Sequence, residues 1–425
     1  MRRQPGFLLI SSAMEKIEGT SNNTGGLKFL VRALHYRNYR LFFIGQGLSL
    51  IGTWMQIIAV IWTVYDLTNS AVLLGVVAFC GQIPTFLLAP LGGVAADKWS
   101  RRRILLVTQS LSLIQALILA ALALSGHIQV WHIIALSILL GLINAFDVPC
   151  RQAFVLDMIE KKEDIVNAIA LNSSMFNGAR LIGPSIAGIL IASVGAGICF
   201  LINALSFLAV LVALGAMRIA PKRNETGDAP LARQLKEGLA YAFGMKPIRD
   251  ILLLLSLVSL FGLSYPVLMP IFAIEILGGD ARTLGFLMAA IGIGALLGTL
   301  QLALQKDVKK INAAIYKATF IFGACLVAFS FSRQLWLSLI FLFCVGFGLI
   351  VQMASSNTVL QSIVSDDKRG RVMSLYTMAF MGMSPFSSLL AGFLATKIGA
   401  PSTIFYSGLA CILGGLFFRF HLRRW

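Results

Sequence analysis

Long apolar stretches alternate with short polar segments along the whole chain, and each apolar stretch is roughly 20 residues long. About 20 apolar residues in an α-helix cross the hydrocarbon core of a bilayer, so each stretch predicts a membrane-spanning helix. The predicted spans lie at 41–64, 73–96, 104–125, 131–150, 166–193, 197–217, 250–274, 283–305, 313–331, 335–358, 372–395 and 401–419. The pattern therefore predicts an all-α polytopic membrane protein with twelve transmembrane helices.

The longest polar stretch follows the sixth span and divides the chain into two halves of six spans each. It contains the segment PKRNETGDAP and an amphipathic stretch around 231–243, which is typical of a helix lying on the membrane surface. The predicted organisation has five parts, namely an N-terminal tail at 1–40, a first six-helix bundle at 41–217, a linker at 218–249, a second six-helix bundle at 250–419 and a C-terminal tail at 420–425.

The two halves carry an internal repeat at an offset of 204 residues. The segment from Val155 matches the one from Val359, and the segment from Gly188 matches the one from Gly392. The offset spans six helices, an even number, so the halves share one orientation and are parallel repeats. Parallel six-helix halves with a site between them are a transporter architecture. The alternative is a duplicated membrane protein that transports nothing.

Composition and charge support a membrane protein and set its orientation. The chain is 58% hydrophobic and only 12% charged, against roughly 25% charged residues in soluble domains. Of its 35 lysines and arginines, 31 lie in the tails, in alternate loops and near the ends of spans on one side. This is the positive-inside pattern, which predicts cytoplasmic termini in a bacterial inner membrane. The net charge of +17 is therefore a topology signal, and no nucleic-acid partner is expected.

Several chemistries lack their residues in this sequence. The phosphate-binding pattern GxxxxGK[ST] does not occur, and neither do HExxH, CxxC or a Cys/His cluster with metal-ligand spacing. No nucleophile and base stand together at membrane depth. We expect no metal, no cofactor and no enzymatic activity.

The loop between the second and third spans carries the most specific motif, Gly93-Val-Ala-Ala-Asp97-Lys98-Trp-Ser100-Arg101-Arg102-Arg103. It resembles the signature loop of the major facilitator superfamily, G-x-x-x-D-[RK]-x-[GS]-R-R-[RK], at every fixed position. The resemblance implies the major facilitator fold, with two six-helix repeats that alternate in access around a central substrate.

Most of the chain, from about residue 37 to 418, resembles one bacterial branch that includes the enterobactin exporter and macrolide efflux proteins. The resemblance lies in segments such as Leu48–Gln56, Pro149–Ala153 and Ala179–Pro184. It implies a monomeric exporter of amphiphilic small molecules, either drug-like compounds or siderophores, driven by proton antiport. An importer, a lysolipid flippase or a non-transporting sensor of the same fold are the alternatives.

The signature loop is expected to latch the cytoplasmic side. Gly93 would let two helices approach closely, and Asp97 would lie near the N-terminus of the eleventh span, where the helix dipole stabilises an anion. Arg101, with Lys98 and Arg102 beside it, would bridge to an acid at the end of the fourth span, either Asp147 or Asp157. The alternative is a basic loop that only sets topology.

Arg180 lies inside the fifth span, where a charge is costly unless it faces a polar cavity or a partner. It is predicted either to hold an anionic or polar substrate group or to clamp a neighbouring helix. Just beyond it, Gly183, Pro184 and Gly188 partly match the antiporter motif of the resembled exporters, and a packing kink is the alternative.

Other polar residues inside the spans are candidates for the transport pathway or for contacts between helices, namely Gln46, Gln56, Gln82, Asn144, Asn172, Asn177, Tyr265, Gln352 and Asn357. Together they suggest a large, mostly neutral cavity. Proton coupling usually needs an intramembrane carboxylate whose pKa is raised by burial. Asp147 is the acid well inside a span, with Asp66 and Glu275 near the opposite face, so it is the first candidate.

Overall fold

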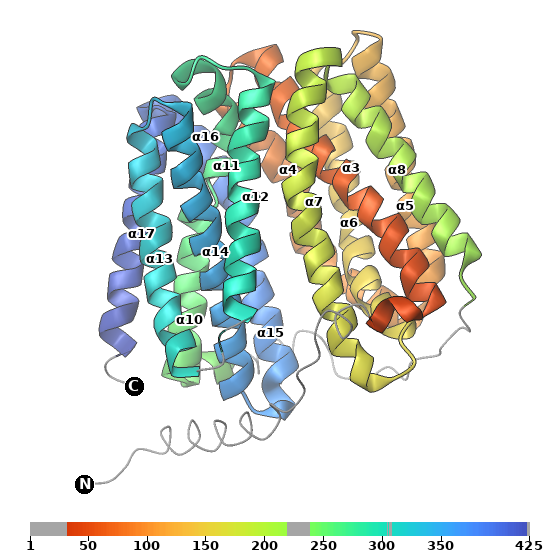
Figure 1. The fold of residues 1–425 in the computed structure, drawn as a ribbon, viewed down its shortest axis with the longest axis vertical. Helices are drawn as coiled ribbons and strands as arrows, with labels where there is room; N and C mark the ends of the chain where they lie inside the picture. Colours follow the sequence, from red (N-terminus) through yellow and green to blue (C-terminus); the bar gives the residue numbers. More distant parts are fainter. Residues whose placement is uncertain (1–31, 219–238, 304, 306–307, 423–425) are drawn as a thin grey trace.

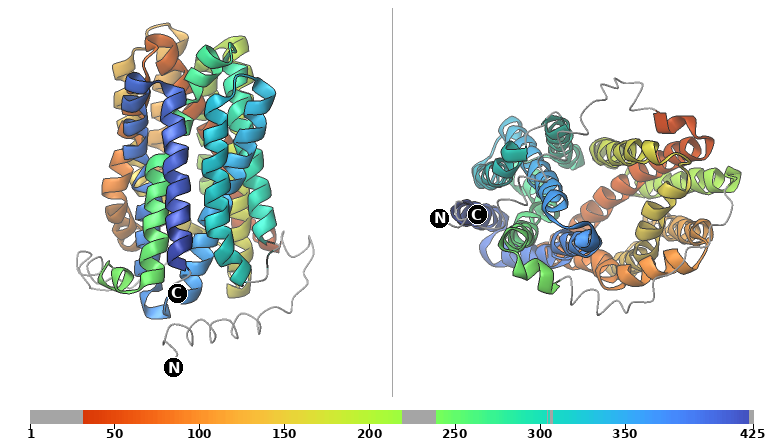
Figure 2. Two further views of the ribbon diagram at one scale, coloured as in Figure 1. Left: turned by 90° about the vertical axis from the view of Figure 1, so that its left-hand side faces the viewer. Right: turned by 90° about the horizontal axis from the view of Figure 1, so that it is seen from below.

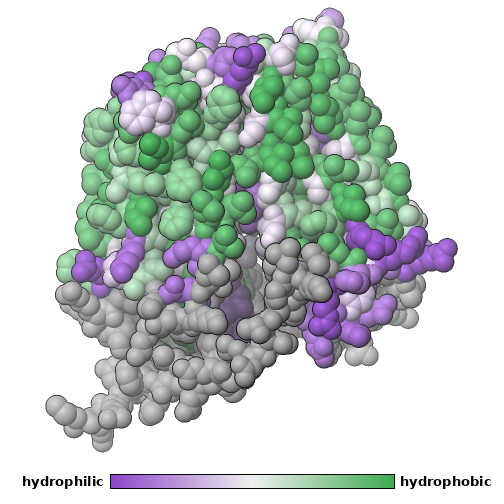
Figure 3. All heavy atoms as spheres, in the orientation of Figure 1, coloured by the Kyte–Doolittle hydropathy of each residue, from purple (hydrophilic) through white to green (hydrophobic). Residues whose placement is uncertain are grey.

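The computed structural model describes residues 32–218, 239–303, 305 and 308–422. Twelve helical segments in these ranges are long and apolar enough to cross a membrane, as the sequence predicts (Figure 1). Hydrophobic residues cover the middle of the face drawn in Figure 3, and hydrophilic residues gather toward its two ends. This belt is the surface that a bilayer would contact.

In the first half each span is one continuous helix. The helices are α3 (Arg37–Thr68), α4 (Ala71–Lys98), α5 (Arg101–Leu124), α6 (Val130–Asp157), α7 (Ile165–Val194) and α8 (Ala196–Ala216), and the short turns η1 (Arg32–His35) and η2 (Lys162–Asp164) precede α3 and α7. Helix α6 continues two turns beyond the predicted end at 150, because Phe154 and Val155 are buried in the bundle.

In the second half, four spans are single helices and two are interrupted. The single helices are α12 (Ala281–Ala303), α13 (Val308–Phe331), α14 (Leu335–Ile363) and α17 (Ala400–Leu422). The seventh span consists of α10 (Lys246–Leu257), the π-turn η3 (Val258–Gly262), α11 (Tyr265–Ile271) and the π-turn η4 (Phe272–Ile276). The eleventh consists of α15 (Asp366–Met381) and α16 (Ser384–Ile398).

The interruptions depart from the continuous helices predicted at 250–274 and 372–395. Prolines follow the first residues of α11 and α16, and a residue before proline is disfavoured in the α-conformation. The two breaks also contact each other, because the Ser259 hydroxyl donates a hydrogen bond to the Phe380 carbonyl. The seventh and eleventh spans are therefore joined at their irregular points.

The segment before α3 docks against the start of α7. The Arg32 guanidinium lies 2.9 Å from the Asp164 carboxylate, and the Tyr36 hydroxyl donates to the same carboxylate at 2.7 Å. The hydrogen bond to Asp164 raises the pKa of the Tyr36 phenol. The predicted surface helix at 231–243 lies largely outside the described residues, which show helix at 239–244.

The two halves stand side by side, and the start of α3 and the end of α17 lie on one face, drawn at the bottom of Figure 1. We call this the terminal face and the other the opposite face. Seen from the terminal face, helices α3–α8 form one group and α10–α17 the other (Figure 2). This is the arrangement expected of two parallel six-helix repeats.

The halves contact each other through two glycine pairs near the opposite face. A Cβ atom placed on Gly188 of α7 would lie 2.8 Å from the Gly285 Cα of α12. A Cβ on Gly75 of α4 would lie 3.2 Å from the Gly392 Cα of α16. Small residues allow such close backbone approach between membrane helices. Gly188 and Gly392 are counterparts in the internal repeat, so the two contacts are related by it.

Candidate functional site

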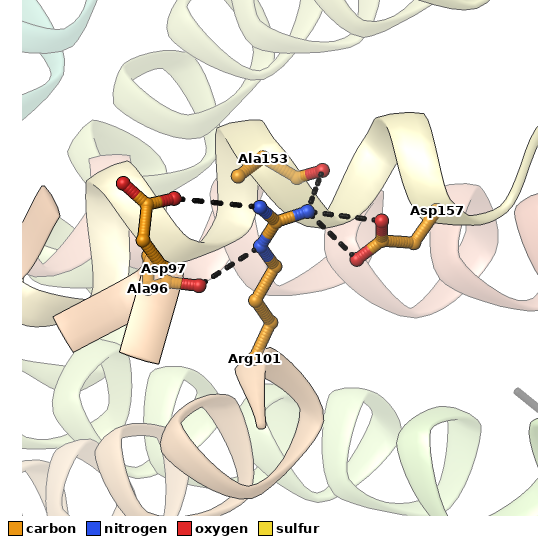
Figure 4. A network of polar contacts seen from close by, with 5 residues as sticks. All are labelled: Ala96, Asp97, Arg101, Ala153 and Asp157. Atoms are coloured by element: carbon orange, nitrogen blue, oxygen red, sulfur yellow. Dashed lines mark hydrogen bonds and ion pairs between the residues drawn. The ribbon is translucent and has the colours of Figure 1, made fainter. Parts of the chain in front are cut away.

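Arg101 is the centre of an ion-pair cluster on the terminal face (Figure 4). Its Nη1 donates to both carboxylate oxygens of Asp157 at 2.9 and 3.0 Å, and to the Ala153 carbonyl at 3.4 Å. Its Nε donates to the Ala96 carbonyl at 3.1 Å, and its Nη2 lies 3.6 Å from Asp97 Oδ1. The planar guanidinium thus joins the ends of α4 and α6 to the start of α5.

The side chains of Arg101 and Asp157 are 14% and 16% exposed, whereas that of Asp97 is 57% exposed. Asp97 therefore pairs with Arg101 of its own half, while its predicted contact with the start of the eleventh span is not seen among the described contacts. The contacts described for the cluster therefore lie within the first half.

Gly93, the first residue of the signature loop, has open space around it. The expectation that Gly93 permits a close helix contact is wrong in this structure, because a Cβ there would meet nothing within 4 Å. The neighbouring Gly92 is the close-contact residue, facing the Ala145 carbonyl and Pro149 of α6. One residue along a helix rotates the side-chain direction by about 100°, so adjacent glycines face different surroundings.

The remaining basic residues of the loop lie apart from the Arg101 cluster. Arg102 donates to the Leu214 carbonyl at 2.8 Å and to the Gly215 carbonyl at 3.0 Å. It therefore satisfies carbonyl groups at the C-terminus of α8, where a cation is favourable. Lys98 is exposed at the end of α4.

Asp147 occupies a separate, buried cluster between α5 and α6. Its Oδ1 accepts hydrogen bonds from Thr108 at 2.9 Å and from Gln109 at 2.8 Å, and its Oδ2 lies 3.4 Å from the Arg151 Nε. Asp147 precedes Asp157 by about 15 Å of helix. Of the two acids considered as partners of Arg101, Asp157 is thus the partner, and Asp147 lies deeper, outside the latch.

Arg180 lies near the middle of α7, and its Cζ is 5.6 Å from the centroid of the Trp54 ring of α3. The Trp54 ring contacts the Phe176 ring edge-on, with centroids 5.8 Å apart. Tyr265 at the start of α11 is fully buried, and its hydroxyl lies close to the Arg180 guanidinium, with no acceptor for its own proton among the described residues. Arg180 of the first half therefore lies beside the helix break of the second.

The fifth-span motif supports this arrangement by close packing. A Cβ on Gly183 would lie 2.5 Å from the Trp54 Cβ and 2.9 Å from the Ile51 carbonyl, so Gly183 brings α7 against α3. Pro184 lies inside the continuous helix α7, and its carbonyl faces Gly285 of the second half. The motif thus runs from the Trp54 contact to the glycine contact between the halves.

Three of the amides that are candidates for the pathway or for contacts between helices are buried. Gln56 donates to Gln115 at 3.2 Å and accepts from Asn203 at 2.7 Å, so both of its polar atoms are hydrogen-bonded inside the first bundle. Gln46 and Gln352 are also buried. For Gln56 these contacts favour the second alternative, a contact between helices.

Two of the remaining amides, Asn144 and Asn177, keep some access. The Asn177 side chain is partly exposed, and its Nδ2 donates to the Ser173 carbonyl of its own helix at 2.9 Å. Asn144 on α6 is half-buried. Asn177 lies one turn from Arg180 on α7, so it is the amide closest along the chain to the candidate site.

A hydrogen bond between Tyr65 of α3 and Glu275 of η4 joins the two halves at the opposite face, and no motif in the sequence indicates this pair. Glu275 stood out only as an acid near that face. The residues are 210 positions apart, and only the packing of α3 against the second half brings them together.

The helical count, the two parallel halves and the contacts between them define a membrane transporter of the major facilitator fold. Two solved structures show the same fold. One is an inward-facing, unoccupied bacterial homologue of the human lysosomal transporter Spinster, with a TM-score of 0.68, 14% identity and coverage of 90% of this chain and 96% of that chain. The other is a POT family transporter in complex with a thioalcohol-conjugated peptide, with a TM-score of 0.71, 12% identity and coverage of 91% and 96%.

The chain belongs to the transmembrane secretion effector family of major facilitator transporters, whose model matches residues 32–425. It is 31% identical to the staphyloferrin A transporter of Staphylococcus aureus over 91% of this chain and 96% of that protein. It is 27% identical to the multidrug efflux pump Tap of Mycolicibacterium fortuitum over 86% and 91%. It is 23% identical to macrolide efflux protein A of Streptococcus pyogenes over 89% and 95%. These proteins are transporters, so the chain belongs with transporters and not with enzymes.

Proposed function

We propose that this protein exports amphiphilic small molecules, drug-like compounds or siderophores, across the bacterial inner membrane by alternating access with proton antiport. The similarity to a siderophore transporter and to two drug exporters over most of each chain supports the substrate class and the outward direction. The partial antiporter motif from Gly183 to Gly188 in α7 supports the same direction.

The excess of lysine and arginine in alternate loops supports a cytoplasmic terminal face. With that orientation, the two glycine pairs and the Tyr65–Glu275 hydrogen bond close the extracellular side. Asp97 is 57% exposed at the terminal face, and the ion pair described for it is with Arg101 of its own half. This pattern of contacts supports an inward-open state, in which substrate enters from the cytoplasm. Closing the cytoplasmic side would bring the Arg101 cluster against the eleventh span.

Asp147 is the residue that we assign to proton coupling. It is a carboxylate buried within a span, the residue type that proton relays in membrane carriers use. Its Oδ1 accepts hydrogen bonds from Thr108 and Gln109 of α5, and its Oδ2 lies 3.4 Å from the Arg151 Nε of its own helix. A movement of α5 against α6 during alternating access would break the contacts with Thr108 and Gln109.

The test is efflux from bacterial cells that lack their main exporters. Cells expressing the chain are loaded with a panel of fluorescent dyes, macrolides and catechol siderophores, with and without a protonophore. Accumulation should fall on expression and recover with the protonophore. Unchanged accumulation across the panel, in cells with the protein in the membrane, would contradict the proposed function.

Direction needs a separate measurement. Counterflow in vesicles of known orientation, loaded with a compound that the efflux panel identifies, should show proton-driven movement from the terminal face to the opposite face. Net movement the other way would make the protein an importer.

A further inference from the structure

The region around Arg180 differs in charge from a site for cationic drugs. Arg180 lies at mid-depth in α7, about 20 Å from either end of the helix. No carboxylate of the described residues lies within ion-pair distance of its guanidinium. The ion pairs of these residues are made by other arginines, namely Arg32, Arg101, Arg151 and Arg249. The positive charge of Arg180 therefore lacks a neutralising partner in the part of the chain that the structure describes.

A second donor lies beside this charge on the other half of the molecule. Tyr265 is fully buried, and its hydroxyl lies close to the Arg180 guanidinium. A guanidinium cannot accept a hydrogen bond, so the Tyr265 O–H proton has no acceptor among the described residues. A buried donor without an acceptor is unfavourable unless something else satisfies it. The Tyr265 hydroxyl and the Arg180 guanidinium are both donors, and an oxyanion is the group that accepts from two donors at once.

The aromatic surroundings indicate the rest of the ligand. The Trp54 ring lies against the guanidinium, and Phe176, whose side chain is well exposed, packs on the Trp54 ring. Such a surface accepts an apolar or planar group next to the anionic one. Asp147 is the described carboxylate well inside a span, and Arg151 already pairs with it. A cationic ligand would therefore meet Arg180 with no opposing carboxylate.

We propose that the region around Arg180 binds an amphiphilic organic anion, with Arg180 and Tyr265 holding its carboxylate and Trp54 and Phe176 contacting its apolar part. This inference rests on the proposed export function and names the substrate class of the same site. Because Arg180 is on α7 and Tyr265 is at the break of the seventh span, a bound carboxylate would bridge the two halves. Its binding energy would then differ between conformations in which the halves are closer or farther apart.

The test compares two dyes that share a xanthene core and differ in charge, carboxyfluorescein and tetramethylrhodamine ethyl ester. Binding to the purified full-length protein in detergent is measured by fluorescence anisotropy. The wild-type protein should bind the anionic dye more tightly. Arg180→Gln should weaken anionic dye binding by about tenfold or more, as expected for losing a hydrogen bond to a charged group, and should leave the cationic dye unaffected or improved.

Two further variants separate binding from structure. Tyr265→Phe should weaken the anionic dye alone, and Arg180→Glu should reverse the preference. Arg333→Gln, which removes a basic residue from the loop between α13 and α14, is the matched control and should bind both dyes like the wild type. Thermal unfolding of each variant checks that the protein is folded.

The proposal is overturned if the wild-type protein does not prefer carboxyfluorescein, or if Arg180→Gln weakens both dyes equally, which would make Arg180 a structural clamp. The efflux panel distinguishes failure of the anion site from failure of the proposed export function. Export of only cationic or neutral compounds would leave the transporter assignment standing and remove the anion site. Failure to export any compound would contradict the function itself.

Discussion

Gly188 of α7 and Gly285 of α12 contact each other so closely that a Cβ on Gly188 would lie 2.8 Å from the Gly285 Cα and 2.7 Å from the Ala281 carbonyl. The contact joins the two halves of the transporter near the opposite face. Its repeat counterpart, Gly392 of α16, makes the same kind of contact with Gly75 of α4. Closure of this face therefore depends on two glycine pairs that the internal duplication produced together.

Substituting Gly188 should prevent this closure. The Cβ of Gly188→Ala would meet backbone atoms, which cannot move as the end of a side chain does, so the helices must separate. We expect transport to fall by about tenfold, since a loss of about 1.4 kcal/mol in the closed state gives that factor. Efflux by cells with equal protein levels measures it.

Gly178→Ala is the matched control, because a Cβ at Gly178 on the same helix would meet nothing within 4 Å. If both variants transport alike, the glycine contact has no role in closure.

Loss of the Arg101 guanidinium should destabilise the terminal face. Arg101→Gln removes the paired hydrogen bonds to Asp157, a largely buried carboxylate, and leaves that carboxylate without its partner. Hydrogen bonds to charged groups contribute about 1.5–3 kcal/mol, so we expect a clear fall in melting temperature in detergent. Arg103→Gln, an exposed neighbour in the same loop, serves as the control. Equal melting temperatures for the two variants would count against the cluster as a structural unit.

Asp147→Asn should uncouple transport from protons. The NH2 group of the new asparagine is a hydrogen-bond donor. It must face either the Arg151 guanidinium or the donor groups of Thr108 and Gln109, so at least one favourable contact of Asp147 is lost. We expect efflux that no longer responds to a protonophore, while exchange of substrate across vesicles persists. Glu160→Gln, at an exposed acid of the terminal face, is the control. Retained protonophore sensitivity in Asp147→Asn would move the coupling role to another acid.

Tyr65→Phe should weaken closure of the opposite face, because it removes the hydrogen bond to Glu275 without changing the ring. A loss of about 1 kcal/mol is expected for one hydrogen bond near the surface, which is a shift of about fivefold in the ratio of the two states. Labelling of a cysteine introduced at Ala281, which is buried where α12 meets Gly188, should become faster. Tyr406→Phe, at an exposed tyrosine, should leave the labelling rate unchanged.

The pattern of apolar stretches was sufficient to predict all twelve spans, because a bilayer requires each crossing segment to be long and apolar wherever it lies in the fold. The signature loop and the repeat were sufficient to indicate the transporter fold, since both are local or periodic in the sequence. Arg180 stood out for the same reason, as a charge inside an apolar stretch is visible without any knowledge of its neighbours.

The tertiary structure alone decided which residues act together. Both Asp147 and Asp157 lie on α6, but only their positions along and around that helix determine that Asp157 meets Arg101. Gly92 and Gly93 are adjacent, yet the helix rotation turns only one of them toward α6. Gln56 and Asn177 both carry an amide, but both polar atoms of the Gln56 side chain are hydrogen-bonded inside the first bundle. The contact of Tyr65 with Glu275 joins residues 210 positions apart and depends on how the two halves are oriented. No local sequence pattern encodes the relative orientation of the halves.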